Sequence, residues 1–491
     1  MRDHLLIHVN GQPHRVTGAM AFQSLSNFLR YDLTLIGTKV VCSEGDCGSC
    51  TVLIGRAENG KIDYRPVTSC IQFLYQLDGA HVITIEGLTY DGQLNPVQEA
   101  MVRCHGAQCG FCTPGFVVSM CSAFERGERE RDALRAALVG NLCRCTGYES
   151  IVRAGLEADH AAMKRIDDLY APGPLISTIS DAHREPVLIR GNGKTFFKPV
   201  TLAEATEFRA ANPGCVIVAG GTDVGVQMNK FMRDPQVVMS LAGMTELRQI
   251  TRDGSALTVG ACATLMELEH ATQDCCPELT GMLRRHGSPL IRNAGTLAGN
   301  IANGSPIGDA MPALFVLGAE IELAGRGGSS RRVDINDFYT GYRTNVMRPD
   351  ELIARVHIPL PSRDELFKLY KVSKRHDLDI SSFMAAFYAT VRGDVIERIR
   401  IAYGGVGPVI LRLPKTETFL TGQPLTAEIM SAAGELARTE ITPISDVRGS
   451  ADFRFQLAEN IVRRFHAEVT ASLDVTVASH DRIGSGNGRP R

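Results

Sequence analysis

Two dense groups of cysteines constrain this chain more than any other feature of its sequence. The first lies in VCSEGDCGSCTVLIG (41–55), where three cysteines occupy nine positions and a fourth follows after nineteen intervening residues. These cysteines are Cys42, Cys47, Cys50 and Cys70. Thiols from one loop converge only if the loop wraps tightly. Gly45 and Gly48 permit this, because glycine takes positive φ without steric cost.

The spacing of the first group, C-x4-C-x2-C with a later fourth cysteine, is that of plant-type 2Fe-2S proteins. Amide groups turned inward by such a loop can donate hydrogen bonds to the cluster sulfurs and adjust the cluster potential. The alternative is a structural zinc site, which usually takes two C-x2-C pairs. Since only Cys47 and Cys50 form such a pair within this group, the spacing favours a 2Fe-2S cluster.

The second group is QCGFCTPG (108–115) followed by LCRCTG (142–147), which contribute one C-x2-C and one C-x-C pair. Its cysteines are Cys109, Cys112, Cys143 and Cys145. In a chain that already carries one four-thiol group, four more thiols spaced to converge predict a second four-ligand metal centre.

Two helix starts are expected beside this second group. Thr113 is a suitable N-cap with Pro114 at the first helical position. A later helix is expected to open at Thr146, which has Glu149 at the capping-box spacing. A helix N-terminus carries a partial positive charge, so both helices would stabilise an anionic thiolate cluster between them.

Composition excludes several other classes of protein. Of 491 residues, 44% are hydrophobic and 22% are charged, and the formal net charge is -2. No apolar run approaches the ~20 residues that span a bilayer. The N-terminus, MRDHLLIHVNGQPHRV, alternates apolar and polar residues before a turn at Asn10-Gly11, which indicates a hairpin strand and not a secretory signal. We expect a cytoplasmic protein that binds neither membranes nor nucleic acid.

The six remaining cysteines lack ligand spacing. In a reducing compartment, fourteen cysteines are poorly explained by disulfides. A free cysteine without a partner motif behaves by default as a small buried hydrophobic residue. We expect this of Cys104, Cys121, Cys215, Cys262, Cys275 and Cys276.

The length of the chain indicates roughly three compact units, and changes in pattern predict the boundaries. Short strands and turns make 1–90 a small α+β domain, and 91–165 is helical in its period. A Pro-Gly-Pro group and weak periodicity make 166–190 an inter-domain linker. Two further α+β domains and a polar, glycine-rich disordered tail are expected at 191–364, 365–474 and 475–491.

Two glycine-rich stretches indicate a phosphate-bearing ligand. VIVAGGTDVG (216–225) is an apolar strand that runs into consecutive glycines, whose backbone can approach a phosphate closely. It is not G-x-G-x-x-G, so a Rossmann fold is not indicated, and such a stretch is more often only a turn. RNAGTLAGNIANGSPIGD (292–309) consists mainly of small residues and suits a loop pressed against a ligand.

These segments resemble the molybdenum hydroxylases, the family that includes xanthine dehydrogenase, aldehyde oxidase and carbon monoxide dehydrogenase. The similarity is carried by CSEGDCGSCTV, QCGFCTPGFVVSM and GNLCRCTGY, and by both glycine-rich stretches. It covers nearly the whole chain. The resemblance implies a multidomain α+β fold: a ferredoxin-like β-grasp 2Fe-2S domain, a helical 2Fe-2S domain, an FAD-binding domain of the PCMH/VAO type, and a C-terminal lobe like that of CO dehydrogenase flavoprotein.

The same resemblance implies the residues that contact FAD. They are Ile217, Val218, Ala219, Gly220, Gly221, Thr222, Asp223, Val224, Thr296, Gly299, Asn300, Ser305, Asp309, Ile353 and Lys371. Without the resemblance, Lys371 would be a solvated surface lysine and Asp309 a turn or helix-cap residue. Tyr342 is expected to lie on the side that meets NAD.

Two later segments, TGYRTNVMRPDELI (340–353) and YKVSKRHDLDIS (370–381), look most like the xanthine dehydrogenase branch of the family. The resemblance implies an iron-sulfur/FAD subunit in a dimer of heterodimers. It would carry electrons from a molybdopterin cofactor on a large partner subunit, through two 2Fe-2S clusters, to FAD and then NAD. The reaction would be the hydroxylation of hypoxanthine or xanthine to urate, with no residue of this chain acting on the purine.

Three alternatives stay open. The chain could be the equivalent subunit of an aldehyde or N-heterocycle dehydrogenase. It could also be an electron-transfer module that serves an acceptor other than NAD. A zinc-stapled scaffold is the third alternative, and it would absorb no visible light.

Overall fold

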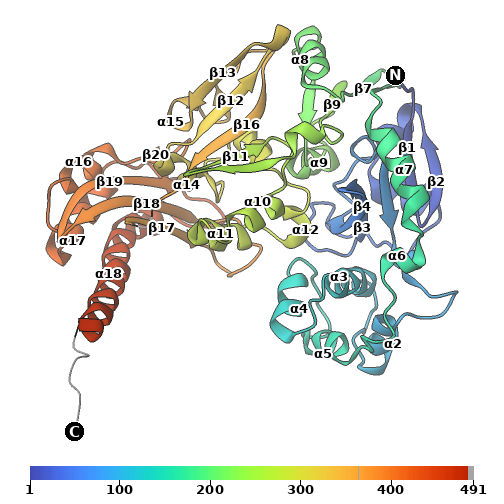
Figure 1. The fold of residues 1–491 in the computed structure, drawn as a ribbon, viewed down its shortest axis with the longest axis horizontal. Coiled ribbons are helices and arrows are strands. Elements are labelled where there is room, and N and C mark those ends of the chain that lie inside the picture. Colours follow the sequence, from blue (N-terminus) through green and yellow to red (C-terminus); the bar gives the residue numbers. More distant parts are fainter. Residues whose placement is uncertain (363, 485–491) are drawn as a thin grey trace.

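The computed structural model describes residues 1–362 and 364–484 of the chain. Figure 1 shows a sheet domain that carries the N-terminus, a helical domain beside it, a central sheet domain, and a C-terminal lobe from which α18 (Ala451–Gly484) extends. The multidomain α+β fold class expected from the sequence is confirmed. Among the described residues, no helix combines the length and the apolar character needed to cross a membrane.

The N-terminal domain is a β-grasp sheet with the strand order β2-β1-β5-β3-β4. β1 and β5 are parallel, and the other neighbouring strands are antiparallel. The strands are β1 (Leu5–Val9), β2 (Gln12–Val16), β3 (Thr51–Glu58), β4 (Lys61–Thr68) and β5 (Ala80–Ile83). In the β3–β4 hairpin Thr51 lies opposite Thr68. The hairpin therefore brings Cys50, just before β3, close to Cys70, just after β4.

The second domain is built from helices that carry the second cysteine group in their connecting loops. These helices are α2 (Pro96–Arg103), α3 (Thr113–Glu125), α4 (Arg131–Ala137) and α5 (Glu149–Glu157). The start predicted for α3 is one residue late, because Cys112 is the N-cap and Thr113 is already helical. The start predicted at Thr146 is wrong: α5 begins after Tyr148, whose backbone is left-handed. The Thr146 hydroxyl donates to the sulfur of Cys143 at 3.1 Å instead of capping the helix.

The segment 166–190 is not the irregular linker that the prolines predicted. It forms α6 (Ile166–Leu169), α7 (Pro172–His183) and the start of β6 (Val187–Gly191). Pro172 occupies the first helical turn, where a missing amide hydrogen costs no bond. Ile179 of α7 is fully buried and packs with the core of the helical domain, so this segment joins domains as a rigid element.

The third domain contains two sheets, in the orders β6-β7-β9-β8 and β10-β11-β16-β12-β13. Its other strands are β7 (Lys194–Lys198), β8 (Val216–Val218), β9 (Val237–Ser240), β10 (Ile250–Asp253), β11 (Ala256–Gly260), β12 (Glu320–Ala324), β13 (Ser330–Asp334) and β16 (Leu352–Pro359), with the short pair β14 (Tyr339–Gly341) and β15 (Thr344–Asn345). Its helices are α8 (Leu202–Ala211), α9 (Thr222–Asn229), α10 (Leu265–Thr272), α11 (Pro277–Arg284), α12 (Pro289–Arg292), α13 (Leu297–Asn303), α14 (Met311–Leu317) and α15 (Ile335–Phe338). One large apolar core includes residues of both sheets.

The C-terminal lobe is an antiparallel sheet, β17-β18-β19-β20, packed against helices. Its elements are β17 (Glu365–Val372), β18 (Phe383–Arg392), β19 (Val395–Gly404), β20 (Leu411–Arg412), α16 (Pro414–Leu420), α17 (Ala427–Arg438) and α18. Phe387 of β18 stacks on Phe465 of α18, with ring centroids 4.6 Å apart.

The disordered tail predicted from residue 475 is wrong for its first part, because α18 continues to Gly484. No proline or glycine interrupts residues 451–483, and a helix commonly ends at the first glycine. Residues 485–491, the rest of that prediction, lie outside the described residues.

Three buried charges join the N-terminal domain to the third domain. Lys198 of β7 donates to Asp78 at 2.5 Å and to the carbonyl of Ala182 at 2.8 Å. Arg2 donates to both carboxylate oxygens of Asp78. Burial alone would raise the pKa of Asp78, but the hydrogen bonds and charges of Arg2 and Lys198 lower it.

We predict that Asp78→Asn lowers the free energy of unfolding by about 3 kcal/mol, because it leaves the ammonium of Lys198 buried without a carboxylate. The matched control is Asp91→Asn, since the Asp91 side chain is 98% exposed and an exposed pair contributes at most about 1 kcal/mol. Urea unfolding followed by circular dichroism measures both. Equal stability of the two variants would contradict the role given to this charge group.

Candidate iron-sulfur and flavin sites

The structure brings all four cysteines of the first group together. The pKa of Cys42 is lowered because the thiols of Cys47 and Cys70 donate hydrogen bonds to its sulfur. Cys50 likewise accepts from Cys70. The backbone amide of Glu44 lies 3.4 Å from the sulfur of Cys42. The sulfurs therefore face one another inside a loop that also turns an amide toward them.

The second group also converges. The sulfurs of Cys109 and Cys145 are 3.6 Å apart. Burial and a hydrogen bond with Cys143 raise the pKa of Cys112 to about 12. Cys109 and Cys145 are exposed, whereas Cys50 and Cys70 of the first group are buried. The first site thus lies inside the protein, and the second opens at its surface.

The donor sets fit two-iron clusters better than single metal ions. In the second group the thiols meet as two pairs, Cys109 with Cys145 and Cys112 with Cys143. In the first group Cys42 contacts Cys47 and Cys70, and Cys70 also contacts Cys50. Each group thus offers the four thiolates that a 2Fe-2S cluster takes. Within the described residues, no group of three or more His, Cys, Asp and Glu side chains is arranged to hold a single metal ion. The six other cysteines are buried, except for partly exposed Cys275.

The predicted glycine turn follows β8 and leads directly into α9. A Cβ on Gly220 would lie 1.9 Å from the carbonyl oxygen of Ala294, so only glycine fits there. Gly221 has a φ of 71° and is the N-cap of α9. The first amides of α9 have no partner within the helix, so this turn can bind phosphate oxygens.

A cavity of about 330 Å³ opens at this turn. Ile217 to Val224 line it, together with Thr296, Gly299 and Asn300. Their contact with FAD stays a prediction. The side-chain oxygen of Asn300 is buried and has no hydrogen-bond partner among the described residues. An unpaired acceptor beside a backbone phosphate loop fits FAD, which carries hydroxyl and amide donors along its length.

Further residues that line the cavity were not in the predicted set. They are Gln227, Arg233, Leu265, His286, Ile291, Gly295, Ala302, Asn303 and Arg343. His286 Nδ1 is also buried without a partner among the described residues. Gly295, Ala302 and Asn303 belong to the small-residue stretch 292–309 that was expected to press against a ligand. The others reach the cavity through contacts between distant segments, which local spacing does not encode.

Four predicted FAD residues do not line this cavity: Ser305, Asp309, Ile353 and Lys371. Lys371 is only 7% exposed, so the surface reading is wrong. Its ammonium donates to Asp309 at 2.6 Å and to the carbonyl of Arg285 at 2.7 Å. Ile353 lies in β16 opposite Leu323, within the core. Four of the fifteen predicted FAD contacts therefore lie outside the lining of this cavity.

The side chain of Ile291 lies between the first cysteine group and the flavin cavity. Ile291 packs against the cluster of Cys50, Cys70 and Ile71, and it also lines the cavity. Asn229, at the end of α9, donates to the carbonyl of Cys70 at 2.8 Å. The cysteine loop and the helix that begins at the phosphate turn are thus in direct contact.

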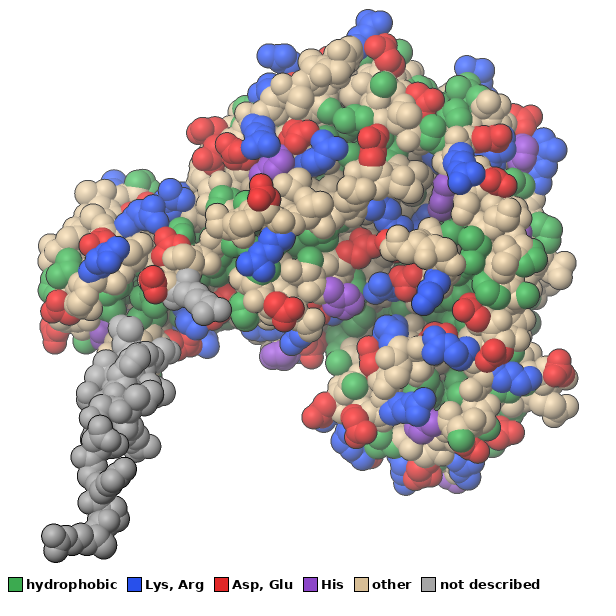
Figure 2. Space-filling view, viewed as in Figure 1, with side chains coloured by type: hydrophobic (Ala, Val, Ile, Leu, Met, Phe, Trp, Pro, Cys, Tyr) green, Lys and Arg blue, Asp and Glu red, His purple; other side chains and the backbone are tan. Residues whose placement is uncertain are grey.

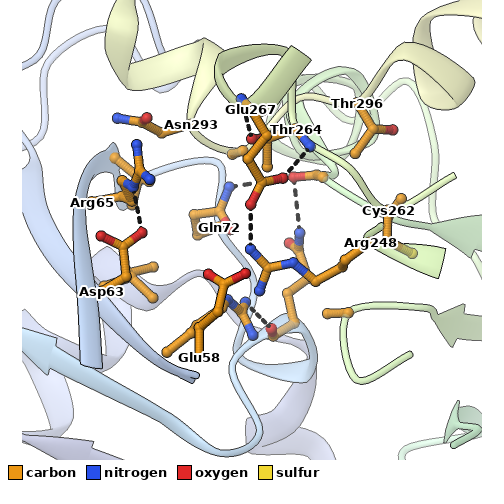
Figure 3. Close-up of a pocket in the computed structure, with 18 residues that line it drawn as sticks. Glu58, Asp63, Arg65, Gln72, Arg248, Cys262, Thr264, Glu267, Asn293 and Thr296 are labelled. Atoms are coloured by element: carbon orange, nitrogen blue, oxygen red, sulfur yellow. Dashed lines mark hydrogen bonds and ion pairs between the residues drawn. The ribbon is translucent and has the colours of Figure 1, made fainter. Parts of the chain in front are cut away.

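Figure 3 shows a second, smaller pocket of about 80 Å³ between the N-terminal and third domains. Arg248 points to Glu267 at 2.6 Å, and Arg65 points to Asp63 at 2.5 Å. Ala219, Gly220 and Thr296 line this pocket as well as the flavin cavity, so the two adjoin at the glycine turn. Figure 2 shows acidic and basic side chains mixed over this face of the molecule, without an extended basic surface.

Three domain families match the chain. The [2Fe-2S] binding domain matches residues 84–156. The FAD binding domain in molybdopterin dehydrogenase matches 191–361, and the CO dehydrogenase flavoprotein C-terminal domain matches 368–469.

Relatives cover most of this chain. Xanthine dehydrogenase of Drosophila subobscura is 29% identical over 96% of the chain and 39% of the relative. Aldehyde oxidase 2 of Rattus norvegicus is 28% identical over 96% and 39%. The solved carbon monoxide dehydrogenase of Hydrogenophaga pseudoflava has a TM-score of 0.53 and 26% identity, over 55% of this chain and 94% of that one. The chain thus spans about 40% of the length of these curated relatives.

The fold, the paired thiols and the phosphate turn define a chain with iron-sulfur and FAD-binding domains. Its matching domain families and its similarity to xanthine dehydrogenase and aldehyde oxidase make the chain similar to the molybdenum hydroxylases.

We predict that Gly220→Ala lowers FAD affinity roughly tenfold or more, or ~1.4 kcal/mol, because the turn must move away from Ala294. Gly214→Ala is the control, since a Cβ there meets nothing within 4 Å. Titration of FAD into the deflavinated chain, followed by flavin fluorescence, measures both affinities. A Gly220→Ala chain that binds FAD as tightly as the control would contradict the site.

Proposed function

We propose that this chain is the iron-sulfur/FAD subunit of a xanthine dehydrogenase. It carries electrons from a molybdenum centre on a partner subunit, through two 2Fe-2S clusters, to FAD and on to NAD during hydroxylation of hypoxanthine or xanthine to urate. The observation that carries this proposal is the contact of Ile291 with both the first cysteine group and the flavin cavity.

A flavin next to iron-sulfur clusters can link a two-electron reaction to single-electron steps. A flavin exchanges electrons singly or in pairs, whereas a 2Fe-2S cluster carries one electron at a time. The cysteines hold the clusters, and the turn at Gly220 and Gly221 holds the FAD pyrophosphate. Lys371, buried against Asp309, fixes β17 beside the loop at Arg285 and so supports the wall of the cavity.

The proposal places the molybdopterin cofactor on a partner subunit. The exposed cysteines Cys109 and Cys145 suit a docking face for that large subunit. Phe111 and Tyr148 beside them are 46% and 41% exposed, and burial against a partner would remove this apolar surface from water. We propose that two such heterodimers form a dimer and that the protein works in the reducing cytoplasm.

The main alternative is the equivalent subunit of an aldehyde or N-heterocycle dehydrogenase. The similarity to aldehyde oxidase 2 is nearly as high as that to xanthine dehydrogenase, so substrate choice rests on the partner's pocket. An acceptor other than NAD is the second alternative.

The chain purified with its co-eluting partner should reduce NAD with xanthine. Turnover with aldehydes or other N-heterocycles alone, or with other acceptors alone, would overturn the proposal.

We predict that Cys109→Ser reduces the iron content from about four to about two per chain, because one of two 2Fe-2S clusters loses a ligand. Cys121→Ser is the matched control, since Cys121 is buried in the same domain at α3 outside either group. Iron is measured by chemical assay on anaerobically purified protein. An unchanged iron content in Cys109→Ser would contradict the second cluster.

We predict that NADH bleaches the flavin of the isolated subunit, and that Tyr342→Ala weakens NADH binding several-fold while FAD stays bound. Tyr342 is 59% exposed, and its neighbour Arg343 lines the flavin cavity, so the ring is open to a second nucleotide. Tyr31→Ala, at a ring 75% exposed in the N-terminal domain, is the control. Stopped-flow absorption at increasing NADH concentration separates binding from bleaching.

A further inference from the structure

The side chain of Asn141 joins the two cysteine-bearing loops. It is 3% exposed, and its amide nitrogen donates to the carbonyl of Gly48 at 3.1 Å and to the hydroxyl of Thr51 at 3.2 Å. Its oxygen accepts from Ser119 at 2.8 Å. Both amide hydrogens and the oxygen are therefore satisfied, as a buried amide requires.

The backbone around Gly48 is too closely packed to accept a side chain. A Cβ on Gly48 would lie 2.3 Å from the carbonyl oxygen of Gly140 and 2.6 Å from the amide nitrogen of Asn141. A Cβ on Gly115, in α3, would lie 2.2 Å from the carbonyl oxygen of Gly48. The loop of the first cysteine group is thus held in backbone contact with the helical domain.

Beside this contact, one backbone hydrogen bond connects a cysteine of the first group to a cysteine of the second. The amide of Leu142, next to Asn141, donates to the carbonyl of Cys47 at 3.0 Å. Leu142 precedes Cys143 in the chain. From Cys47 of the first group to Cys143 of the second, the path consists of covalent bonds and this one hydrogen bond.

We propose that Asn141 is a positioning residue for electron transfer between the two clusters. Its three hydrogen bonds fix the loop of Cys47 against Leu142, and so fix the separation and orientation of the cluster ligands. The inference rests on the two-cluster part of the proposed function. It adds that a side chain which touches neither cluster sets their mutual geometry.

The test compares Asn141→Asp with the parent full chain. Aspartate keeps the shape but loses both amide donors, and it places a carboxylate against the carbonyl of Gly48. Asn95→Asp is the matched control: Asn95 is 1% exposed in the same domain as Asn141. Its amide donates to Leu88 at 2.9 Å, which lies in neither cysteine-bearing loop. The first readout is the spin-spin splitting between the two reduced clusters, measured by low-temperature EPR.

We expect Asn141→Asp to keep its iron and weaken this splitting, while Asn95→Asp leaves it unchanged. The second readout is hydrogen-deuterium exchange of the peptide containing Leu142. This exchange should speed up roughly tenfold in Asn141→Asp, or ~1.4 kcal/mol, because the variant loses two hydrogen bonds. This readout applies even if the variant loses a cluster. Unchanged splitting, or unchanged exchange at Leu142, overturns the inference. A parent chain with fewer than two clusters overturns the proposed function instead.

Discussion

The arrangement of the candidate cofactor sites depends on the loop of the first cysteine group. This loop contacts the helical domain on one side and the wall of the flavin cavity on the other. The loop of the first cysteine group contacts the helical domain at Gly48, where no side chain would fit. On its other side, a Cβ on Gly45 would lie 2.5 Å from Ile71 and 3.1 Å from Ile291, the residue that reaches the flavin cavity. Larger residues at Gly45 or Gly48 would move the first cysteine group away from the wall of the flavin cavity and from the helical domain.

This arrangement explains why the domains form a rigid unit and not a flexible chain of modules. The phosphate turn contributes, because the carbonyl of Gly220 accepts from Gln76 of the N-terminal domain at 3.0 Å. The buried charges of Lys198 and Asp78 hold the same two domains together at another point. Electron transfer between cofactors needs fixed separations, and paired buried groups provide them because their partners cannot be exchanged for water.

Local sequence signals predicted α+β domains, the cysteine loops and the strand that runs into consecutive glycines, because spacing and glycine conformation are properties of short segments. The detailed fold class came from the family resemblance. The predicted helix cap at Thr146 was wrong, because the Thr146 hydroxyl donates a hydrogen bond to the sulfur of Cys143. The predicted linker at 166–190 was also wrong, because burial of α7 against other domains overrides the prolines. The contact of Gly48 with Asn141 spans 93 residues of sequence, and no local pattern encodes it. The FAD role of Lys371 remains a prediction, because its ion pair with Asp309 lies outside the lining of the cavity.

The most direct test of the central claim is the electron capacity of the purified chain. An anaerobic reductive titration, followed by visible absorption and EPR, counts the electrons that each chain accepts. We predict about four, one for each of two 2Fe-2S clusters and two for the flavin. A capacity of two with no EPR signal from reduced clusters would show that the thiols hold no redox centres and would contradict the account.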